Sequence, residues 1–169
     1  MVDTTESLGD EIVPVLKETL TDLVQKFDIS EGKTHVSLET FHRIATVRNN
    51  FNDPTYWSVS AVIDLIDTSI DILKKPTRLD RALRTANDEM FCEGNGYWPG
   101  KKNILVVFTD GRTHQKTHSL TLTSSIEGLK VTIIQLAWFF EALQNDINRM
   151  LKWKKVDVFK CSRRLKLLS

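Results

Sequence analysis

The chain has 169 residues, of which 41% are hydrophobic and 27% charged, and it contains only 7 glycines and 4 prolines. This composition excludes a disordered, collagen-like or coiled-coil chain and predicts one packed globular domain. The 23 basic and 22 acidic residues give a net charge of +1, so no overall field favours a nucleic acid or an anionic membrane. The longest purely apolar runs are far shorter than the roughly 20 residues of a membrane-spanning helix. We therefore expect a soluble domain with no nucleic-acid partner and no membrane insertion.

The start of the chain and its cysteines do not fix the cellular compartment. No positively charged stretch followed by an apolar one opens the sequence, so no signal peptide is visible, although a piece of a secreted protein would look the same. Cys92 and Cys161 are too few and too far apart for a zinc knuckle or a disulfide scaffold. Two unpaired buried thiols are the simpler interpretation.

The first third of the chain predicts a helix followed by a hairpin. Apolar residues recur at spacings of three and four from Leu8 to Phe27, which is typical of an amphipathic helix, with Pro14 near its start. After turn residues that include Gly32, the alternating pattern of 35–41 predicts a strand, and 45–47 is its expected hairpin partner.

The rest of the chain alternates helices and strands. Helical spacing predicts helices from Val59 to Leu73 and from Leu79 to Phe91. The runs Ile104–Phe108 and Val131–Ala137 are apolar on both faces, as strands covered by helices on both sides must be. A helix over 147–153, an edge strand over 156–159 and the start of a helix over 163–168 complete the expected elements. The pattern predicts an α/β fold with a doubly wound, mostly parallel sheet and helices on both faces.

Oxygen-bearing side chains gather in the loops expected at the carboxyl ends of the strands, where such sheets place their functional sites. Residues at spacing two in an extended segment project to one side, so Asp3, Thr5 and Ser7 can present three oxygens to one point. Thr77 precedes a predicted helix and Asp110 follows a predicted central strand. Two carboxylates balance a divalent charge, and hydroxyls and waters complete a shell suited to Mg²⁺. An ion held this way still attracts a third carboxylate, offered by another molecule.

Three segments resemble, in order, the motifs of one family. Residues 2–9 resemble the Asp-x-Ser/Thr-x-Ser opening of the metal-ion-dependent adhesion site (MIDAS) of von Willebrand factor type A domains, the fold shared with inserted integrin domains. Residues 76–83 resemble the second motif, whose threonine is a metal ligand, and 106–111 resemble the third, whose aspartate completes the site. The resemblance implies a metal site formed by Asp3, Thr5, Ser7, Thr77 and Asp110.

The same resemblance implies a function. It points to a non-enzymatic protein-binding module for adhesion or the extracellular matrix, extracellular or secreted. Its cofactor would be Mg²⁺, with Mn²⁺ or Ca²⁺ as substitutes. The expected partner is a protein ligand, such as collagen or another matrix protein, that offers Glu or Asp to the ion.

The sequence departs from the family pattern at three places. Only Met1 and Val2 precede Asp3, whereas the family has an apolar strand there, so we expect residues 1–169 to be a single domain of this type that lacks most of its first central strand. Because the first strand is short, we also expect Thr5 and Ser7 to be less firmly held than Asp110, which directly follows a buried strand. Trp138–Phe140 stands where the family usually turns at a glycine, and the last helix stops at Ser169.

An enzyme is the alternative interpretation of the same acids. Asp3 and Asp110 at two strand ends could form the Mg²⁺ site of a phosphotransferase or phosphatase on a doubly wound sheet. Phosphatases similar to haloacid dehalogenases have a second Asp at the position of Thr5. Both these phosphatases and response-regulator receivers have a lysine at the position of Trp138. No glycine-rich phosphate loop is present.

Two weaker signals lie in the last third of the chain. His114 and His118 would share a helix face and could bind zinc, but their polar neighbours favour a solvated loop. Seven basic residues from Lys152 onward could bind a polyanion, although a solvated helix face is the simpler interpretation.

Overall fold

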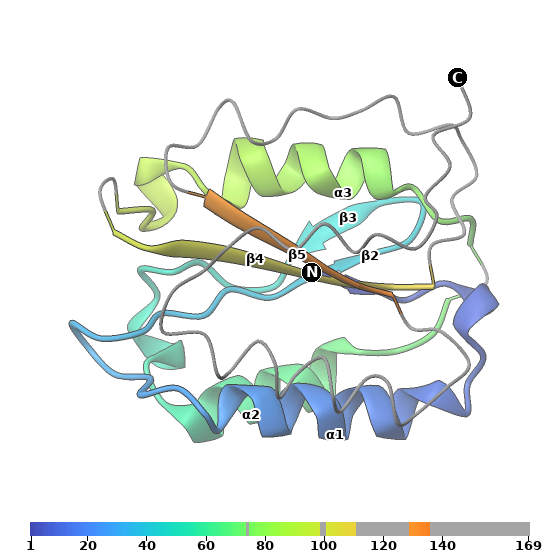
Figure 1. The fold of residues 1–169 in the computed structure, drawn as a ribbon, viewed down its shortest axis with the longest axis horizontal. Helices are drawn as coiled ribbons and strands as arrows, with labels where there is room; N and C mark the ends of the chain where they lie inside the picture. The colour runs from blue at the N-terminus through green and yellow to red at the C-terminus, as the bar shows by residue number, and fades with distance from the viewer. Residues whose placement is uncertain (74, 99–100, 111–128, 136–169) are drawn as a thin grey trace.

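The computed structural model describes residues 1–73, 75–98, 101–110 and 129–135. Its centre is a five-stranded sheet in the order β3-β2-β1-β4-β5, in which only the β2–β3 pair is antiparallel. Helices cover both faces of this sheet, which confirms the predicted doubly wound α/β class (Figure 1). The strands are β1 (Val2–Asp3), β2 (Glu39–Phe41), β3 (Ala45–Val47), β4 (Asn103–Thr109) and β5 (Leu129–Gln135).

The helices divide between the two faces. Figure 1 shows α1 (Ile12–Val24) and α2 (Val59–Ser69) on one face and α3 (Leu79–Thr85) on the other. A π-helical turn, η3 (Ala86–Met90), continues α3. Three short 3₁₀ turns complete the described elements: η1 (Glu6–Leu8), η2 (Pro54–Tyr56) and η4 (Glu93–Asn95).

The core has two halves, one on each side of the sheet. Phe108 packs with the α1 and α2 side chains, whereas its neighbour Val107 packs with those of α3. Consecutive strand residues point to opposite faces, so β4 must be apolar throughout to bury both sides. Ile104 at its amino end departs from this pattern, because 46% of it is exposed.

Two helices are shorter than the sequence predicts. The first begins at Ile12, because Leu8 lies in the separate turn η1. The second ends at Ser69 instead of Leu73, because Ile70 has an extended backbone with φ −96° and ψ 107°. Leu73 forms an isolated parallel bridge to Thr5. The residues after α2 therefore pair with the segment after β1 instead of extending the helix.

The hairpin was predicted with a first strand that is too long. The β2–β3 ladder begins at Glu39, opposite Val47, instead of near His35. The side chain of Asn49 takes the place of a strand neighbour before that point: its Oδ1 accepts from the Leu38 amide at 2.8 Å, and its Nδ2 donates to the Val36 carbonyl at 2.8 Å. The sequence pattern gives no sign that the Asn49 side chain replaces a neighbouring strand here; only the folded structure shows it.

The strand β1 has two residues and lies between β2 and β4. Val2 is opposite Thr40 on one side and Phe108 on the other. An apolar cavity of about 430 Å³ adjoins it, lined by residues that include Met1, Leu20 and Leu105. The two-residue β1 places Asp3 at the centre of the sheet's carboxyl edge.

The predicted elements at 147–153, 156–159 and 163–168 lie outside the described residues, as do His114, His118, Trp138–Phe140 and the basic tail. The strand predicted over 131–137 is described as β5, at one end of the described sheet. None of the described helices has the length and apolar character needed to cross a membrane.

Glu39 is a buried acid that makes stability depend on pH. It is fully buried, and neither of its carboxylate oxygens has a hydrogen-bond partner among the described residues. Burial raises the pKa of Glu39 from 4.5 to about 8, although the Met1 ammonium opposes that rise and Glu89 adds to it. The unfolded chain loses this proton first, so the contribution to stability is complete below pH 4.5 and is lost as pH rises through about 8.

We therefore expect Glu39→Gln to become increasingly stabilising with pH. Below pH 4.5 the stabilities of the variant and the parent should depend on pH in the same way. By pH 8 the variant should gain on the order of 4 kcal/mol relative to the parent. Urea unfolding at a series of pH values measures this difference, with the exposed Glu93→Gln as the matched control. Parallel pH curves for Glu39→Gln and the parent would show that Glu39 is not a buried neutral acid.

Candidate metal site

Three segments meet at the carboxyl edge of the sheet. β1 ends at Asp3, and β4 ends at Thr109, directly before Asp110. The segment after α2 joins them through Leu73, whose amide donates to the Thr4 carbonyl at 2.8 Å and whose carbonyl accepts from the Glu6 amide at 3.1 Å. This backbone pairing brings Thr77 beside the first segment, although 72 residues separate it from Thr5.

The Thr5 hydroxyl is the hub of the cluster. Its Oγ1 lies 2.8 Å from Asp3 Oδ1, 2.9 Å from Ser7 Oγ and 2.9 Å from Thr77 Oγ1. A carboxylate can only accept, so Thr5 donates its single proton to Asp3 and accepts from the other two hydroxyls. Four of the five residues predicted for the site are therefore joined in one hydrogen-bond network.

The fifth predicted residue, Asp110, lies near enough to act on Asp3. Burial raises the pKa of Asp3 from 3.8 to about 6, the hydrogen bonds from Thr5 and Thr109 oppose the rise, and the Asp110 carboxylate adds to it. A cation bound beside Asp3 would favour its ionised form, which burial and the neighbouring carboxylate disfavour. The electrostatics of this edge thus favour a bound positive charge.

The donor set fits a hard divalent cation. Carboxylate and hydroxyl oxygens are the ligands that Mg²⁺, Mn²⁺ and Ca²⁺ prefer, and the two carboxylates supply a charge of −2. Among the described residues, no cluster of three or more His, Cys, Asp or Glu side chains is found.

The structure changes one expectation about how firmly the predicted site residues are held. Thr5 is 1% exposed and Thr77 is 5% exposed, and the bridge to Leu73 anchors the Thr5 backbone. The expectation that Thr5 is loosely held is therefore wrong. Ser7 lies in η1 and is exposed, so the cluster opens to solvent on that side.

Two threonines that support the site were missed in the sequence. Thr109 Oγ1 donates to Asp3 Oδ2 at 2.8 Å, so each oxygen of that buried carboxylate has a donor. Thr4 ties the same segment to β2, since its amide and its hydroxyl both contact the Phe41 carbonyl, at 2.8 and 3.1 Å. The sequence did offer a signal for these two residues, because each lies directly next to a predicted aspartate of the site.

Cys92 is half-buried and forms no disulfide with a described residue. Cys161 lies outside the described residues, so the expectation of two unpaired buried thiols stays a prediction.

Comparison with known proteins shows which family the sequence matches. The family model of the von Willebrand factor type A domain matches residues 1–153. Matrilin-1 of Gallus gallus is 25% identical over 113 residues, which are 67% of this chain and 22% of the relative. Matrilin-1 of Homo sapiens is 22% identical over 131 residues, which are 78% of this chain and 26% of the relative. The chain thus spans about a quarter of the length of these relatives.

Solved structures share the fold. Proximal thread matrix protein 1 from the mussel byssus superposes with a TM-score of 0.73 at 15% identity, over 89% of this chain and 45% of that one. The same protein, solved with a zinc-occupied MIDAS motif, gives 0.66 at 16% identity, over 78% and 36%. Manganese-loaded Plasmodium vivax TRAP protein gives 0.66 at 14% identity, over 95% and 63%.

Proposed function

Because the chain belongs to the von Willebrand factor type A domain family, we propose that it is a divalent-metal-dependent protein-binding module. Its ion is Mg²⁺, for which Mn²⁺ or Ca²⁺ can substitute, and a partner protein offers the ion a Glu or Asp side chain. The single observation that carries the proposal is the Thr5 hub, which joins one buried aspartate to two other hydroxyls beside a second aspartate.

The proposed ligands have distinct roles. Asp3 and Asp110 supply the negative charge, and Thr5, Ser7 and Thr77 supply neutral oxygens. A bound divalent ion would act as a Lewis acid that binds a third carboxylate from outside, because only two protein charges oppose it. Thr109 and Thr4 orient Asp3 and its segment through the hydrogen bonds described above.

The relatives support a role outside the cell. One structural neighbour is a thread matrix protein of the mussel byssus, and the same protein was also solved with zinc in its MIDAS motif. We propose an extracellular or secreted module for adhesion or the matrix, with collagen or another matrix protein as the partner class and no enzymatic activity.

Calorimetric titration with Mg²⁺ and Mn²⁺ tests the proposal. The parent chain should bind one ion, and Asp110→Ala should lose most of that affinity because half of the site's charge is removed. Asp64→Ala is the matched control, since Asp64 is exposed on α2. Equal ion binding by Asp110→Ala and the parent would contradict the assignment of Asp110 to the metal site. Turnover of an aryl phosphate by the parent would favour the alternative function of a phosphotransferase.

A further inference from the structure

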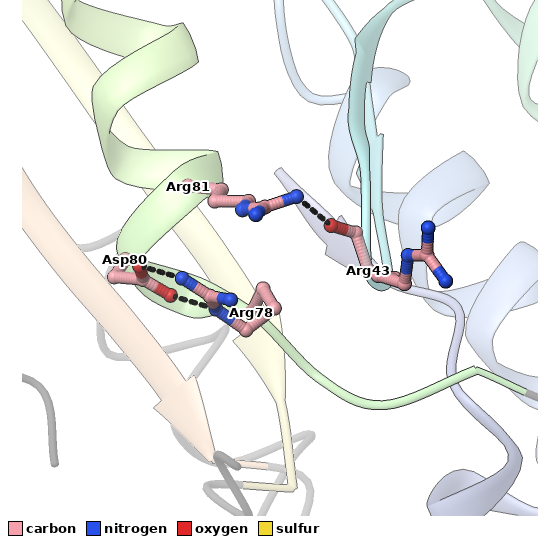
Figure 2. A network of polar contacts seen from close by, with 4 residues as sticks. All are labelled: Arg43, Arg78, Asp80 and Arg81. Atoms are coloured by element: carbon pink, nitrogen blue, oxygen red, sulfur yellow. Dashed lines mark hydrogen bonds and ion pairs between the residues drawn. The ribbon is translucent and has the colours of Figure 1, made fainter. Parts of the chain in front are cut away.

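A group of basic residues lies beside the proposed metal site, on the β2–β3 hairpin and on the segment that carries Thr77. The two parts are joined by hydrogen bonds: the Arg78 amide donates to the His42 carbonyl at 3.1 Å, and Arg81 Nη1 donates to the Arg43 carbonyl at 3.2 Å. Figure 2 shows the Arg81 side chain reaching from α3 to the hairpin turn, while the Arg43 side chain points away from α3. The hairpin turn is thus fixed next to the residues that flank Thr77.

Most of these charges are not neutralised. Arg78 pairs with Asp80 through two hydrogen bonds of 2.8 and 2.7 Å, so this pair adds little net charge (Figure 2). Four exposed residues form no ion pair with any other described residue, and we call them the basic rim: Arg43, Arg48, Lys75 and Arg81.

Three residues of the basic rim act on the same neighbouring side chain. Lys75, Arg48 and Arg43 all act on the His42 imidazole and, after burial, lower its pKa. The three charges therefore all lie near enough to His42 to act on its imidazole. Since the whole chain carries a net charge of only +1, this concentration is local.

Exposed apolar side chains accompany the basic rim. Ile44, in the same turn as Arg43, is 55% exposed, and Leu73, whose backbone pairs with Thr4 and Glu6, is 40% exposed. A surface that mixes exposed aliphatic side chains with positive charge suits a polypeptide better than a uniformly polar polyanion.

We propose that the partner segment reaching the metal site is acidic along its length: beyond the one carboxylate offered to the ion, it places further Asp or Glu side chains over the basic rim. An apolar side chain of the same segment packs against Ile44 or Leu73. This inference rests on the proposed function, because the metal site anchors the segment, and the basic rim then selects among acid-bearing partners by charge.

Three synthetic peptides test the selection, each added to the full chain loaded with Mn²⁺. The first has one central Glu with Ser and Gly on both sides, the second has the same Glu with Asp and Glu on both sides, and the third keeps the acidic flanks around a central Gln. The second should bind about tenfold more tightly than the first at low salt, since several exposed charge pairs contribute together. Its advantage should shrink at high salt, and the third should bind more weakly than the second.

A pair of double variants locates the effect. Arg43→Gln with Lys75→Gln should remove most of the advantage of the acidic flanks. Mn²⁺ affinity should stay within about twofold of the parent's, because both residues are exposed and neither is a proposed ligand. Lys26→Gln with Lys102→Gln is the matched control, with the same change of charge at exposed residues near the carboxyl end of α1 and the amino end of β4. This control should keep the full advantage.

The outcomes separate the two proposals. If the first peptide binds only with Mn²⁺ but acidic flanks add nothing, the basic rim has no selective role and the proposed function stands. If no peptide binds the Mn²⁺-loaded chain, both proposals fail. If a sulfated oligosaccharide binds the basic rim more tightly than the second peptide and needs no metal, the acidic polypeptide is the wrong occupant.

Discussion

Replacement of Asp3 by asparagine is expected to lower Mn²⁺ affinity by about 100-fold or more while leaving the metal-free domain about as stable as the parent. The substitution keeps the side chain's shape and removes one of the two charges that hold the ion. Asp3 is fully buried, and its burial already disfavours the ionised form, so the neutral amide costs the metal-free fold little. Most destabilising core substitutions would instead weaken the fold and the site together.

Thermal unfolding with and without Mn²⁺ measures both effects at once. At a free concentration of 100 times its Kd, the ion should stabilise the parent by about 2.7 kcal/mol. Asp3→Asn should unfold near the parent's metal-free temperature and show almost no response to Mn²⁺. The exposed Asp64→Asn is the matched control and should respond as the parent does. A full Mn²⁺ response in Asp3→Asn would exclude this carboxylate from the site.

Replacement of Thr77 by valine is expected to separate metal binding from partner binding. Thr77 is buried, and its hydroxyl touches Thr5 at 2.9 Å, but it comes from a different segment than the other hydroxyls. A water can replace one neutral oxygen around the ion, so Mn²⁺ affinity should fall only a few-fold. We infer that Thr77 must coordinate the ion directly once the partner carboxylate is bound, so peptide binding should fall at least tenfold.

Calorimetry with Mn²⁺ and then with a Glu-bearing peptide resolves the two steps for Thr77→Val. Thr77→Ser restores the hydroxyl and should recover most of the peptide affinity, which a purely structural role for the methyl group would not allow. If Thr77→Val bound both Mn²⁺ and peptide like the parent, Thr77 would not belong to the site.

The cluster of oxygen-bearing side chains could be predicted because its residues follow strand ends. Asp3, Thr5 and Ser7 alternate along one short segment, and the predicted adjacency of their oxygens is confirmed by the contacts of 2.8 and 2.9 Å. The position of Asp110 followed from an apolar run that could only be an interior strand. Local periodicity thus predicted the parallel sheet and the edge at which these side chains meet.

Other features depend on contacts between distant residues, which periodicity does not encode. The apolar spacing from Val59 to Leu73 continues past Ser69, yet pairing of Leu73 with Thr4 and Glu6 ends the helix early. The side chain of Asn49 shortens β2 in a similar way. The burial of Glu39 contradicts the usual exposure of glutamate, so only the assembled sheet reveals it.

Paramagnetic broadening by Mn²⁺ in the amide NMR spectrum tests most directly whether the five predicted residues hold one ion. Because the effect depends steeply on distance, substoichiometric Mn²⁺ should broaden first the amide signals of Thr5, Ser7, Thr77 and Asp110. Those of Lys26 and Lys102, near the carboxyl end of α1 and the amino end of β4, should stay sharp. Broadening centred elsewhere in the chain, or equal weak broadening of all exposed amides, would contradict a metal site at the carboxyl edge of β1 and β4.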